Sequence, residues 1–534
     1  MYYCILHVLL HLAYIVAFFR IDPTVRRVRQ ATQRRYLGDD IGSDKGMLPP
    51  LYTYIRIQVS YRPQASNSVQ KMVKHYELGI LDQRPNLCTY SVVLLGFPVR
   101  DDQIDHVKYH LHRAADRLGT AFPWLRGRVR RTFNHQDETT SSGTYYLDLH
   151  TKHDILKVQD INPDGHSYAK IVLNGAPMHM LPAQSLTDQR GFPEHIDTSK
   201  EHAPAFEIKA NFMLGGLLLC FATNHDVPDM TGQAQLIRLF ALAMRGIPFT
   251  PAQVEIGNID RIVAIPKLRS REARMEFPIF KREKPSRDSV LDLCSEVTSD
   301  AIWKMVRFPA ESLSWLKVAA NRAAEDAVED PSVDVASGGW ASTNDALSAF
   351  LWQRISKARM NSTGSHQETR MVRILNCRQR VNPPISHEYI GNFVFATVAT
   401  SPVRCVQDSR QFATIAKDLR RAIHSVNDYT IRAFVSRIDE DSDKSAYYFD
   451  ASLREKCDLT ISSWAEMGLN SIDFGFLGTP DIARRPLMAS SESCVCLVDK
   501  TKHGDIDAAM CLSEDEWVTL ARDDIWNKHA AIVG

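Results

Sequence analysis

Net charge is almost absent from this sequence of 534 residues, which holds 64 Lys and Arg against 63 Asp and Glu. A formal net charge of +1 at pH 7 gives no bulk electrostatic reason to expect a nucleic-acid partner. Collagen-like, coiled-coil and disordered compositions are missing too, because 25 Gly, 25 Pro and 44% hydrophobic residues are ordinary globular values. The chain is therefore long enough to bury large cores.

Paired cysteine motifs are lacking as well. None of the ten cysteines stands in a C-x-x-C pair, and only Cys494 and Cys496 lie close together. Scattered cysteines in a long chain predict reduced thiols and a cytoplasmic location. His106 and His110 share one face of a helix predicted over residues 101–118, but no thiol or carboxylate pattern completes a site. We therefore predict no metal and interpret these histidines as part of a solvated helix face.

Several catalytic motifs are also missing. The sequence contains no G-x-x-x-x-G-K-S/T phosphate loop, no H-E-x-x-H pair and no G-x-S-x-G elbow. The glycines near Gly475 do not follow the G-x-G-x-x-G spacing. These absences disfavour kinases, zinc proteases, serine hydrolases and simple dinucleotide-binding enzymes.

The N-terminal segment, residues 1–64, differs from the rest of the chain. Residues 1–60 contain eight Lys and Arg against four Asp and Glu, whereas the remainder is slightly acidic. Residues 2–19 carry no formal charge and would form about 27 Å of helix, the lower limit for a membrane span. The arginines that follow would keep the body in the cytosol. The interpretations that stay open are a membrane anchor, an accessory segment, or an artefact of a start codon placed too far upstream.

The body of the chain mixes predicted strands and helices in both halves. The halves are separated by residues 256–300, which contain three prolines among many charges and predict a crossover. In the second half, Ser342-x-x-Asp345 and Ser513-x-x-Glu516 are capping boxes that predict two helix starts. The pattern predicts two large α/β lobes rather than three or four small domains.

One stretch, residues 215–242, combines a predicted strand and a predicted helix with side chains that can carry out chemistry. Leu217–Phe221 predicts a buried strand, and the apolar residues after Leu236 recur at helical spacing. His225 therefore stands at the carboxyl end of a strand, where α/β sheets place ligands. Its ordinary pKa of about 6.5 suits a general base, and Asp229 is close enough to hold the turn or the imidazole. Alone, this spacing fits an ordinary loop, a metal ligand pair or part of a serine triad.

A second stretch favours one interpretation. Residues 459–486 contain Asp473-Phe474-Gly475 and Ser462-Ser463-Trp464. With His225-x-x-x-Asp229, they resemble the HxxxD, DFGWG and T/S-S-W motifs of the BAHD and fungal trichothecene 3-O-acetyltransferase-like acyltransferases. The second motif departs from the family pattern, because it reads DFGFLG. Further matches follow in the family's order at residues 81–83, 122–129, 342–347, 378–384 and 389–392.

The resemblance implies a mixed α/β, two-lobe fold with the active site between the lobes. Each lobe would hold a mixed β-sheet with flanking helices, over residues 65–255 and 301–534. It implies a monomeric enzyme that transfers an acyl group, such as acetyl, from acyl-CoA to a hydroxyl of a small secondary metabolite. No bound cofactor is needed, because acyl-CoA is a co-substrate.

The resemblance also implies roles for individual residues. His225 would take the hydroxyl proton and return it to the leaving thiolate, without a covalent acyl-enzyme. Asp229, Asp473 and Gly475 would be structural, with Arg378 or Arg380 as the partner of Asp473. Residues 462–464 would lie on the oxyanion and CoA side, and positive charge such as that of Arg484 and Arg485 would meet the anionic CoA.

Two rival functions stay open at this point. One is a condensation-type acyltransferase that uses a carrier-protein thioester, although Asn224 stands where such domains carry a second histidine. The other is a catalytically inactive family member that acts as a binding protein, against which the intact His225 argues.

Overall fold

The computed structural model describes most of the chain from β1 (His75–Glu77) onward. The described residues are 75–84, 87–132, 144–150, 152–161, 166–198, 202–269, 271–272, 280–282, 300–322, 339–360, 367–441, 444, 447–449, 454 and 456–533. No helix among them is long and apolar enough to cross a membrane. The N-terminal segment, with the anchor predicted at residues 2–19, lies outside the described residues.

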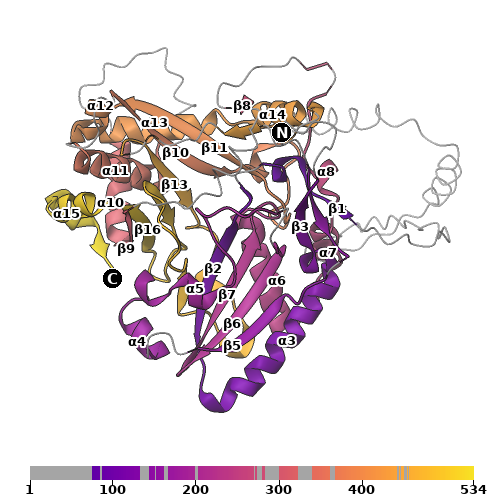
Figure 1. Cartoon of the computed structure of the whole chain (residues 1–534). Coiled ribbons are helices and arrows are strands. Elements are labelled where there is room, and N and C mark those ends of the chain that lie inside the picture. The colour runs from indigo at the N-terminus through magenta and orange to yellow at the C-terminus, as the bar shows by residue number, and fades with distance from the viewer. Residues whose placement is uncertain are drawn as a thin grey trace, which may run out of the picture. The chain divides into compact units, whose positions relative to one another are not determined.

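The first lobe is built on a five-stranded sheet of order β14-β2-β7-β6-β5. Its strands β6 (Phe206–Met213) and β7 (Gly216–Asn224) are buried along their whole length, which confirms the buried strand predicted from the apolar run. Helices α3 (Ile104–Ala121) and α6 (Met230–Met244) pack against each other beside this sheet (Figure 1). The turn from β7 into α6 therefore lies deep in the lobe.

Shorter elements complete the first lobe, including a three-stranded sheet of order β1-β4-β3. The other strands are β2 (Tyr90–Pro98), β3 (Arg128–Arg131), β4 (Tyr145–Asp148) and β5 (Leu156–Asp160). The other helices are α4 (Tyr168–Leu173), α5 (Ala183–Leu186), α7 (Pro251–Gly257) and α8 (Arg261–Ala264). The 3-10 turns are η1 (Ile80–Asp82), η3 (Asp101–Gln103), η4 (Pro123–Arg126) and η6 (Met178–Met180).

The second lobe is built on a seven-stranded mixed sheet of order β11-β10-β13-β15-β16-β9-β17. Strand β13 (Leu459–Ser463) runs parallel to both its neighbours, β10 (Glu368–Asn376) and β15 (Cys494–Leu497). The remaining neighbours are antiparallel. Helices α10 (Ala310–Asn321) and α11 (Thr343–Ala358) pack together with α13 (Phe412–His424) and α15 (Glu514–Ala521) beside this sheet (Figure 1).

The remaining elements of the second half are short. The strands are β9 (Ile302–Phe308), β11 (Val394–Pro402), β16 (Ile506–Leu512) and β17 (Ala531–Ile532), and the pair β8 (Phe280–Arg282) and β12 (Tyr447–Phe449) forms a separate ribbon. The helices are α12 (Val403–Gln407), α13 (Phe412–His424), α14 (Asp428–Glu440), α15 (Glu514–Ala521) and α16 (Asp524–His529). The 3-10 turns are η8 (Arg378–Arg380), η9 (Ser409–Gln411), η11 (Leu469–Ser471) and η12 (Gly475–Leu477).

Local sequence signals predict these elements well. The mixed α/β class, with one large mixed sheet in each lobe, is confirmed. Ser342 caps α11 by accepting from the N–H of Asp345, and Ser513 caps α15 by accepting from that of Glu516. Both predicted capping boxes are therefore present, because they depend on residues only three positions apart.

One strand crosses the boundary expected between the lobes. Strand β14 (Ile482–Arg484) comes from the C-terminal half, yet it pairs antiparallel with β2 at the edge of the first sheet. Residues 301–534 therefore do not form a separate sheet domain. The three-residue sequence Ile-Ala-Arg carries no local signal for its distant partner, so periodicity could not reveal this exchange.

Candidate active site

His225 stands at the first position of the turn between β7 and α6. Its backbone N–H donates to the carbonyl of Thr89 at 2.8 Å, and the N–H of Val227 closes the turn on the carbonyl of Asn224 at 2.9 Å. All other residues from Asn224 to Asp229 are buried, whereas His225 is partly exposed. The turn therefore presents one reactive side chain from a rigid, buried frame.

The surroundings of His225 favour a neutral imidazole. Burial lowers the pKa of His225 below its ordinary value of about 6.5, and the charge of Arg84 acts in the same direction. A hydrogen bond to the backbone of His225 itself opposes this shift, and Asp229 and Asn392 add smaller effects in the same opposing direction. At neutral pH the imidazole is therefore unprotonated and able to accept a proton.

Asp229 caps α6 and is held from three directions. One carboxylate oxygen accepts from the N–H of Gly232 and from Arg378 Nη2, both at 2.9 Å. The other accepts from Arg378 Nη1 and from the N–H of Phe393, both at 2.8 Å. Burial raises the pKa of Asp229, but Arg378 and the other donors outweigh it, so the net shift is downward. These contacts hold the turn, and both carboxylate oxygens of Asp229 are occupied by these donors.

Arg378 is therefore the partner of Asp229, and the pairing expected for Asp473 is wrong. Arg380 donates to the carbonyls of Ile423 and Val426, both at 3.0 Å. Asp473 instead pairs with Arg245, at the end of α6, with 3.4 Å between Oδ2 and Nη1. Order along the chain could not distinguish these arginines, because the choice depends on which segments the two lobes bring together.

The loop around Asp473 packs on the first lobe. The N–H of Gly475 donates to Asp473 Oδ1 at 2.8 Å, and Gly475 adopts a φ of +74°, which favours glycine. Phe474 is fully buried, with its ring edge-on to Phe97 at 4.9 Å. The adjacent Phe476 is 48% exposed.

The exposed Phe476 contacts the histidines predicted to form a solvated face. Its ring centroid lies 5.0 Å from that of His106 and 5.1 Å from that of His110. The two imidazoles lie 4.5 Å apart. No cluster of three or more His, Cys, Asp or Glu side chains suited to a metal occurs in the described part of the chain. The histidine face therefore seats the DFGFLG loop rather than facing only solvent.

We expect Asp473→Ala to lower the free energy of unfolding by only about 1–2 kcal/mol. Its pair with Arg245 is exposed, with 37% and 48% of the two side chains accessible, and one turn hydrogen bond is lost with it. Denaturant unfolding of this variant beside Arg245→Ala checks the value. Loss of soluble, folded protein in Asp473→Ala alone would contradict it.

Residues 462–464 lie at the end of β13, beside the start of α11. Ser463 Oγ accepts from Asn344 Nδ2 at 2.8 Å, and Asn344 Oδ1 accepts from Arg373. The N–H of Trp464 donates to the carbonyl of Leu497 at 2.7 Å. Both serines are partly exposed, whereas the Trp464 side chain is buried.

Positive charge is concentrated next to Ser463. Asp345 pairs with Arg373 at 2.8 Å and also with Arg420, so one carboxylate faces two guanidinium groups. By contrast, the arginines predicted to meet CoA are buried and engaged. Arg484 pairs with Asp507 at 2.7 Å, and Arg485 donates to the carbonyl of Phe192.

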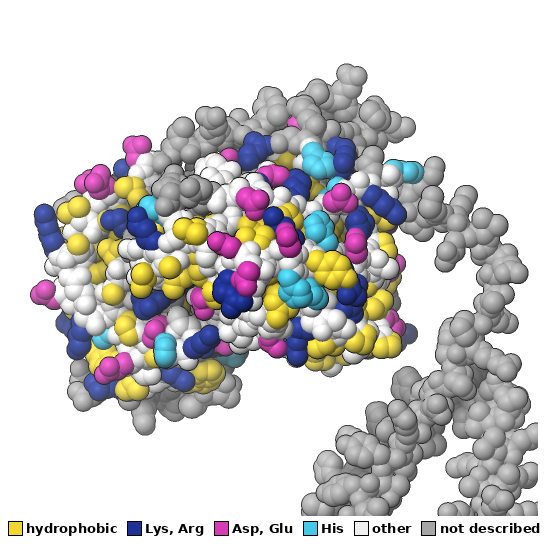
Figure 2. Space-filling view, turned by 90° about the horizontal axis from the view of Figure 1, so that it is seen from below, with side chains coloured by type: hydrophobic (Ala, Val, Ile, Leu, Met, Phe, Trp, Pro, Cys, Tyr) yellow, Lys and Arg dark blue, Asp and Glu magenta, His cyan; other side chains and the backbone are white. Residues whose placement is uncertain are grey.

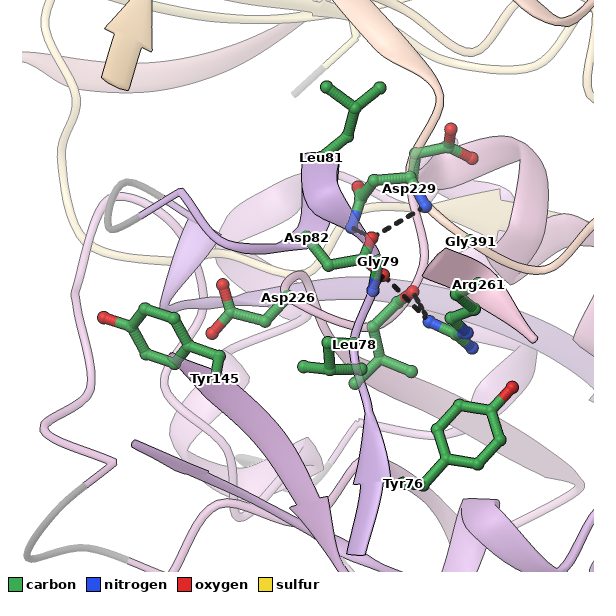
Figure 3. Close-up of polar contacts among 12 residues, drawn as sticks. Tyr76, Leu78, Gly79, Leu81, Asp82, Tyr145, Asp226, Asp229, Arg261 and Gly391 are labelled. Carbon is green, nitrogen blue, oxygen red and sulfur yellow. Dashed lines mark hydrogen bonds and ion pairs between the residues drawn. The ribbon is translucent and has the colours of Figure 1, made fainter. Parts of the chain in front are cut away.

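A second buried network, not predicted from the sequence, supports the turn. Asp82 accepts from the N–H of Gly79 at 2.8 Å and from the backbone and side-chain nitrogens of Asn392 at 3.1 and 2.8 Å. Arg261 Nη1 lies 3.5 Å from Asp82 Oδ2 and donates to the carbonyl of Val227 (Figure 3). Asp82 and Asn392 belong to residues 81–83 and 389–392, two segments that resemble the family's motifs. The order of these segments along the chain was the only sequence signal, and it did not indicate that the two residues are in contact.

Asp226 lies apart from both networks, between Asp82 and Tyr145 in the view of Figure 3. It is fully buried, and neither oxygen meets ordinary hydrogen-bond geometry within the described residues. Burial raises the pKa of Asp226 well above its ordinary value, against the weaker effect of the Cys88 thiol. Burial therefore favours the neutral form of the Asp226 carboxyl, whereas Arg378 and the backbone donors favour the charged form of Asp229.

Two family models match the chain. One, for the Transferase family, matches residues 183–524, and another, for the trichothecene 3-O-acetyltransferase-like N-terminal domain, matches residues 89–244. The first spans the turn with His225 and the loop with Asp473, and it covers more than half of the sequence. The chain belongs to the Transferase family. It is an acyltransferase, and the resemblance to the trichothecene 3-O-acetyltransferase-like enzymes is confirmed.

Relatives match along nearly their whole length. The O-acyltransferase pigD of Monascus ruber is 32% identical over 459 residues, which cover 85% of this chain and 98% of that protein. The trichothecene 3-O-acetyltransferase TRI101 of Fusarium sporotrichioides is 28% identical, with coverage of 88% and 100%. A crystal structure of the Fusarium sporotrichioides TRI101, complexed with coenzyme A and T-2, matches with a TM-score of 0.74 at 26% identity, over 86% of this chain and 100% of that one.

Proposed function

We propose that this acyltransferase moves an acyl group from acyl-CoA to a hydroxyl of a small secondary metabolite, with His225 as general base. The observation that carries this proposal is the partly exposed, neutral His225 on an otherwise buried turn. The similar TRI101 structure holds coenzyme A and T-2, which supports the same pair of substrate classes here. Acetyl is the acyl group that the names of several relatives favour.

The proposed reaction is a direct transfer. His225 removes the proton from the acceptor hydroxyl as the oxygen attacks the thioester carbonyl, which forms a tetrahedral oxyanion. The carbon–sulfur bond then breaks, and the protonated His225 returns the proton to the CoA thiolate. Holding both substrates in one site supplies the alignment that this step needs, and no nucleophile on the protein is required.

The residues at the end of β13 suit the CoA side of this site. Ser462 and Ser463 are partly exposed polar groups, and the excess positive charge of Arg373 and Arg420 over Asp345 favours an anion. The N-terminus of α11 adds a favourable dipole at the same place. We assign this region, including Trp464, to recognition of the acyl donor.

We expect Ser463→Ala to raise the KM for acetyl-CoA by about 3- to 10-fold with little change in kcat. The substitution removes a partly exposed hydroxyl and releases Asn344 from its contact. Steady-state kinetics at saturating acceptor measure the effect. Ser314→Ala, which removes a hydroxyl bonded within α10, is the matched control. A fall in kcat at unchanged KM would place Ser463 outside the donor site.

The activity itself is tested by mixing the protein with acetyl-CoA, a thiol-detecting dye and a panel of terpenoid, polyketide and alkaloid alcohols. We expect thiol release that depends on one class of alcohol. Release that requires no alcohol, or transfer that occurs only from a carrier-protein thioester, would overturn the proposal.

We further propose that the protein acts as a cytoplasmic monomer on small molecules. The face in Figure 2 mixes positive, negative and hydrophobic side chains without a continuous basic stripe, which gives nucleic acid no evident footprint there. Light scattering tests the monomer. Fractionation of the full-length chain against one that starts at residue 61 tests membrane contact through residues 2–19.

A further inference from the structure

A cavity of about 340 Å³ lies between segments from the two halves of the chain. The first lobe supplies walls from β1, η1, β4 and α8, and the second half supplies Asp439 of α14 and Lys444. Pockets for small molecules have volumes of about 300–1,000 Å³ and occur preferentially where two parts of a protein meet. The cavity therefore has the size and the position of a site for a small molecule.

The walls of this cavity are apolar inside and polar toward solvent. Leu78 and Ile80 are buried, and Ile262 is partly buried, so the inner lining is mostly hydrocarbon. Glu77 and Thr132 are exposed, and they line the outer part. Such a lining favours a molecule with an apolar body and a few oxygen substituents.

The polar groups of the lining offer little to an anion. The carboxylates of Glu77 and Asp439 outnumber the one ammonium group, that of Lys444. Lys444 Nζ donates to the carbonyl of Asp439 at 2.9 Å and lies 3.7 Å from its Oδ1. The amide of Gln83 is occupied as well, because its Nε2 and Oε1 bond to the backbone of Tyr145 at 3.0 and 2.7 Å. The cavity therefore suits an uncharged molecule and not the phosphates of acyl-CoA.

Two walls of the cavity belong to segments that hold the catalytic turn. Turn η1 carries Asp82, and Asn392 Nδ2 donates both to Asp82 Oδ1 and to the carbonyl of His225, each at 2.8 Å. Helix α8 carries Arg261, which donates to another carbonyl of the same turn. Leu78 of the cavity wall lies beside Asp82 and Arg261 (Figure 3). A single layer of residues therefore separates the cavity from the turn.

We propose that this cavity receives the apolar body of the acceptor alcohol and that its shape selects which alcohol is acylated. Burial of hydrocarbon against Leu78, Ile80 and Ile262 supplies the binding energy. The oxygen substituents of the alcohol meet the polar outer part of the cavity. The donor region at the end of β13 is built from other residues, none of which lines this cavity. This inference rests on the proposed function, because it names the place of the second substrate.

Ile262→Trp tests the proposal by filling the cavity from a partly buried wall. Its control, Val263→Trp, adds the same ring at the next position of α8, where the side chain is 71% exposed and does not line the cavity. If Ile262→Trp does not fold, Thr144→Phe narrows the cavity from a different wall and takes its place in the comparison.

Two properties are measured on each variant. Calorimetry without acyl-CoA gives the affinity for farnesol and 2-naphthaleneethanol, two uncharged apolar alcohols. Steady-state kinetics give the KM for an accepted alcohol and the KM for acetyl-CoA.

We expect the wild type and Val263→Trp to bind at least one of the two alcohols equally well. Ile262→Trp should bind that alcohol at least about tenfold more weakly, because small misfits in an apolar pocket change affinity by about 10- to 200-fold. The KM for the accepted alcohol should rise by a similar factor, whereas the KM for acetyl-CoA should stay nearly unchanged.

Equal binding in Ile262→Trp and Val263→Trp would overturn the inference, and so would a wild type that binds neither alcohol. Weaker binding with an unchanged KM for the accepted alcohol would also overturn it, because the cavity would then hold a second molecule and not the substrate. Calorimetry needs no chemistry, so His225→Ala should bind the alcohols as the wild type does. Binding that Ile262→Trp weakens, in a protein that transfers no acyl group, would instead overturn the proposed function.

Discussion

We expect His225→Ala to abolish acyl transfer while the fold is retained. A positioned general base contributes about 10²- to 10⁴-fold to such a reaction, and no second base stands on the exposed side of the turn between Asn224 and Asp229. The fold should survive because the turn is held through backbone groups that alanine keeps: the N–H of His225 on Thr89 and its carbonyl on Asn392.

Turnover of acetyl-CoA with an accepted alcohol measures this effect, and thermal unfolding verifies the fold. His503→Ala, which changes an exposed histidine far along the chain, is the matched control and should keep full activity. Turnover within a few-fold of wild type in His225→Ala, with the control unaffected, would remove His225 from the mechanism.

The second large effect concerns stability. Arg378→Ala should lower the free energy of unfolding by about 3–5 kcal/mol, because it leaves the carboxylate of Asp229 charged and buried without its cation. Arg378 is fully buried and makes two contacts to Asp229 and two to the carbonyls of Tyr389 and Gly391. Activity should fall with stability, since the same contacts hold the turn that carries His225.

Arg100→Ala is the control for this prediction. It removes an arginine from an exposed pair with Asp102, in which 73% and 69% of the side chains are accessible, and should leave the stability nearly unchanged. Chemical denaturation of both variants separates the two cases. Equal, small losses would mean that the buried pair contributes no more than a surface pair.

The pair also predicts a pH dependence. The pKa of Asp229 is lowered in the folded protein, so its stabilising effect is complete above the ordinary aspartate pKa of about 3.9 and is lost as the pH falls through the lowered folded value. The stability difference between wild type and Arg378→Ala should therefore be largest near neutral pH and shrink at acidic pH. A difference that grows on acidification would contradict this sign.

The sequence reveals the parts of the site that depend on near neighbours. The strand before His225, the helix after it and the cap at Asp229 follow from residues within about twenty positions. The long-range partners of those residues cannot be predicted from such short segments. Asp229 meets Arg378 149 positions away, and neither has a local signal for the other.

The same dependence on long-range packing explains why the partners predicted for Asp473, Arg484 and Arg485 are wrong. Asp473 was expected beside Arg378 or Arg380, but the loop that carries it packs on the end of α6, where Arg245 lies. Likewise, Arg484 and Arg485 follow this loop in sequence yet turn into the protein to meet Asp507 and Phe192. Residue type indicates the kind of partner, whereas long-range packing selects which one.

The most direct test of the account is a single-turnover experiment with acetyl-CoA, analysed for free thiol, ester product and protein mass together. We expect thiol and ester to appear in equal amounts, only when an accepted alcohol is present and only with His225 intact, while the protein mass stays unchanged. A burst of thiol without alcohol, together with a protein heavier by one acetyl group, would contradict direct transfer driven by His225.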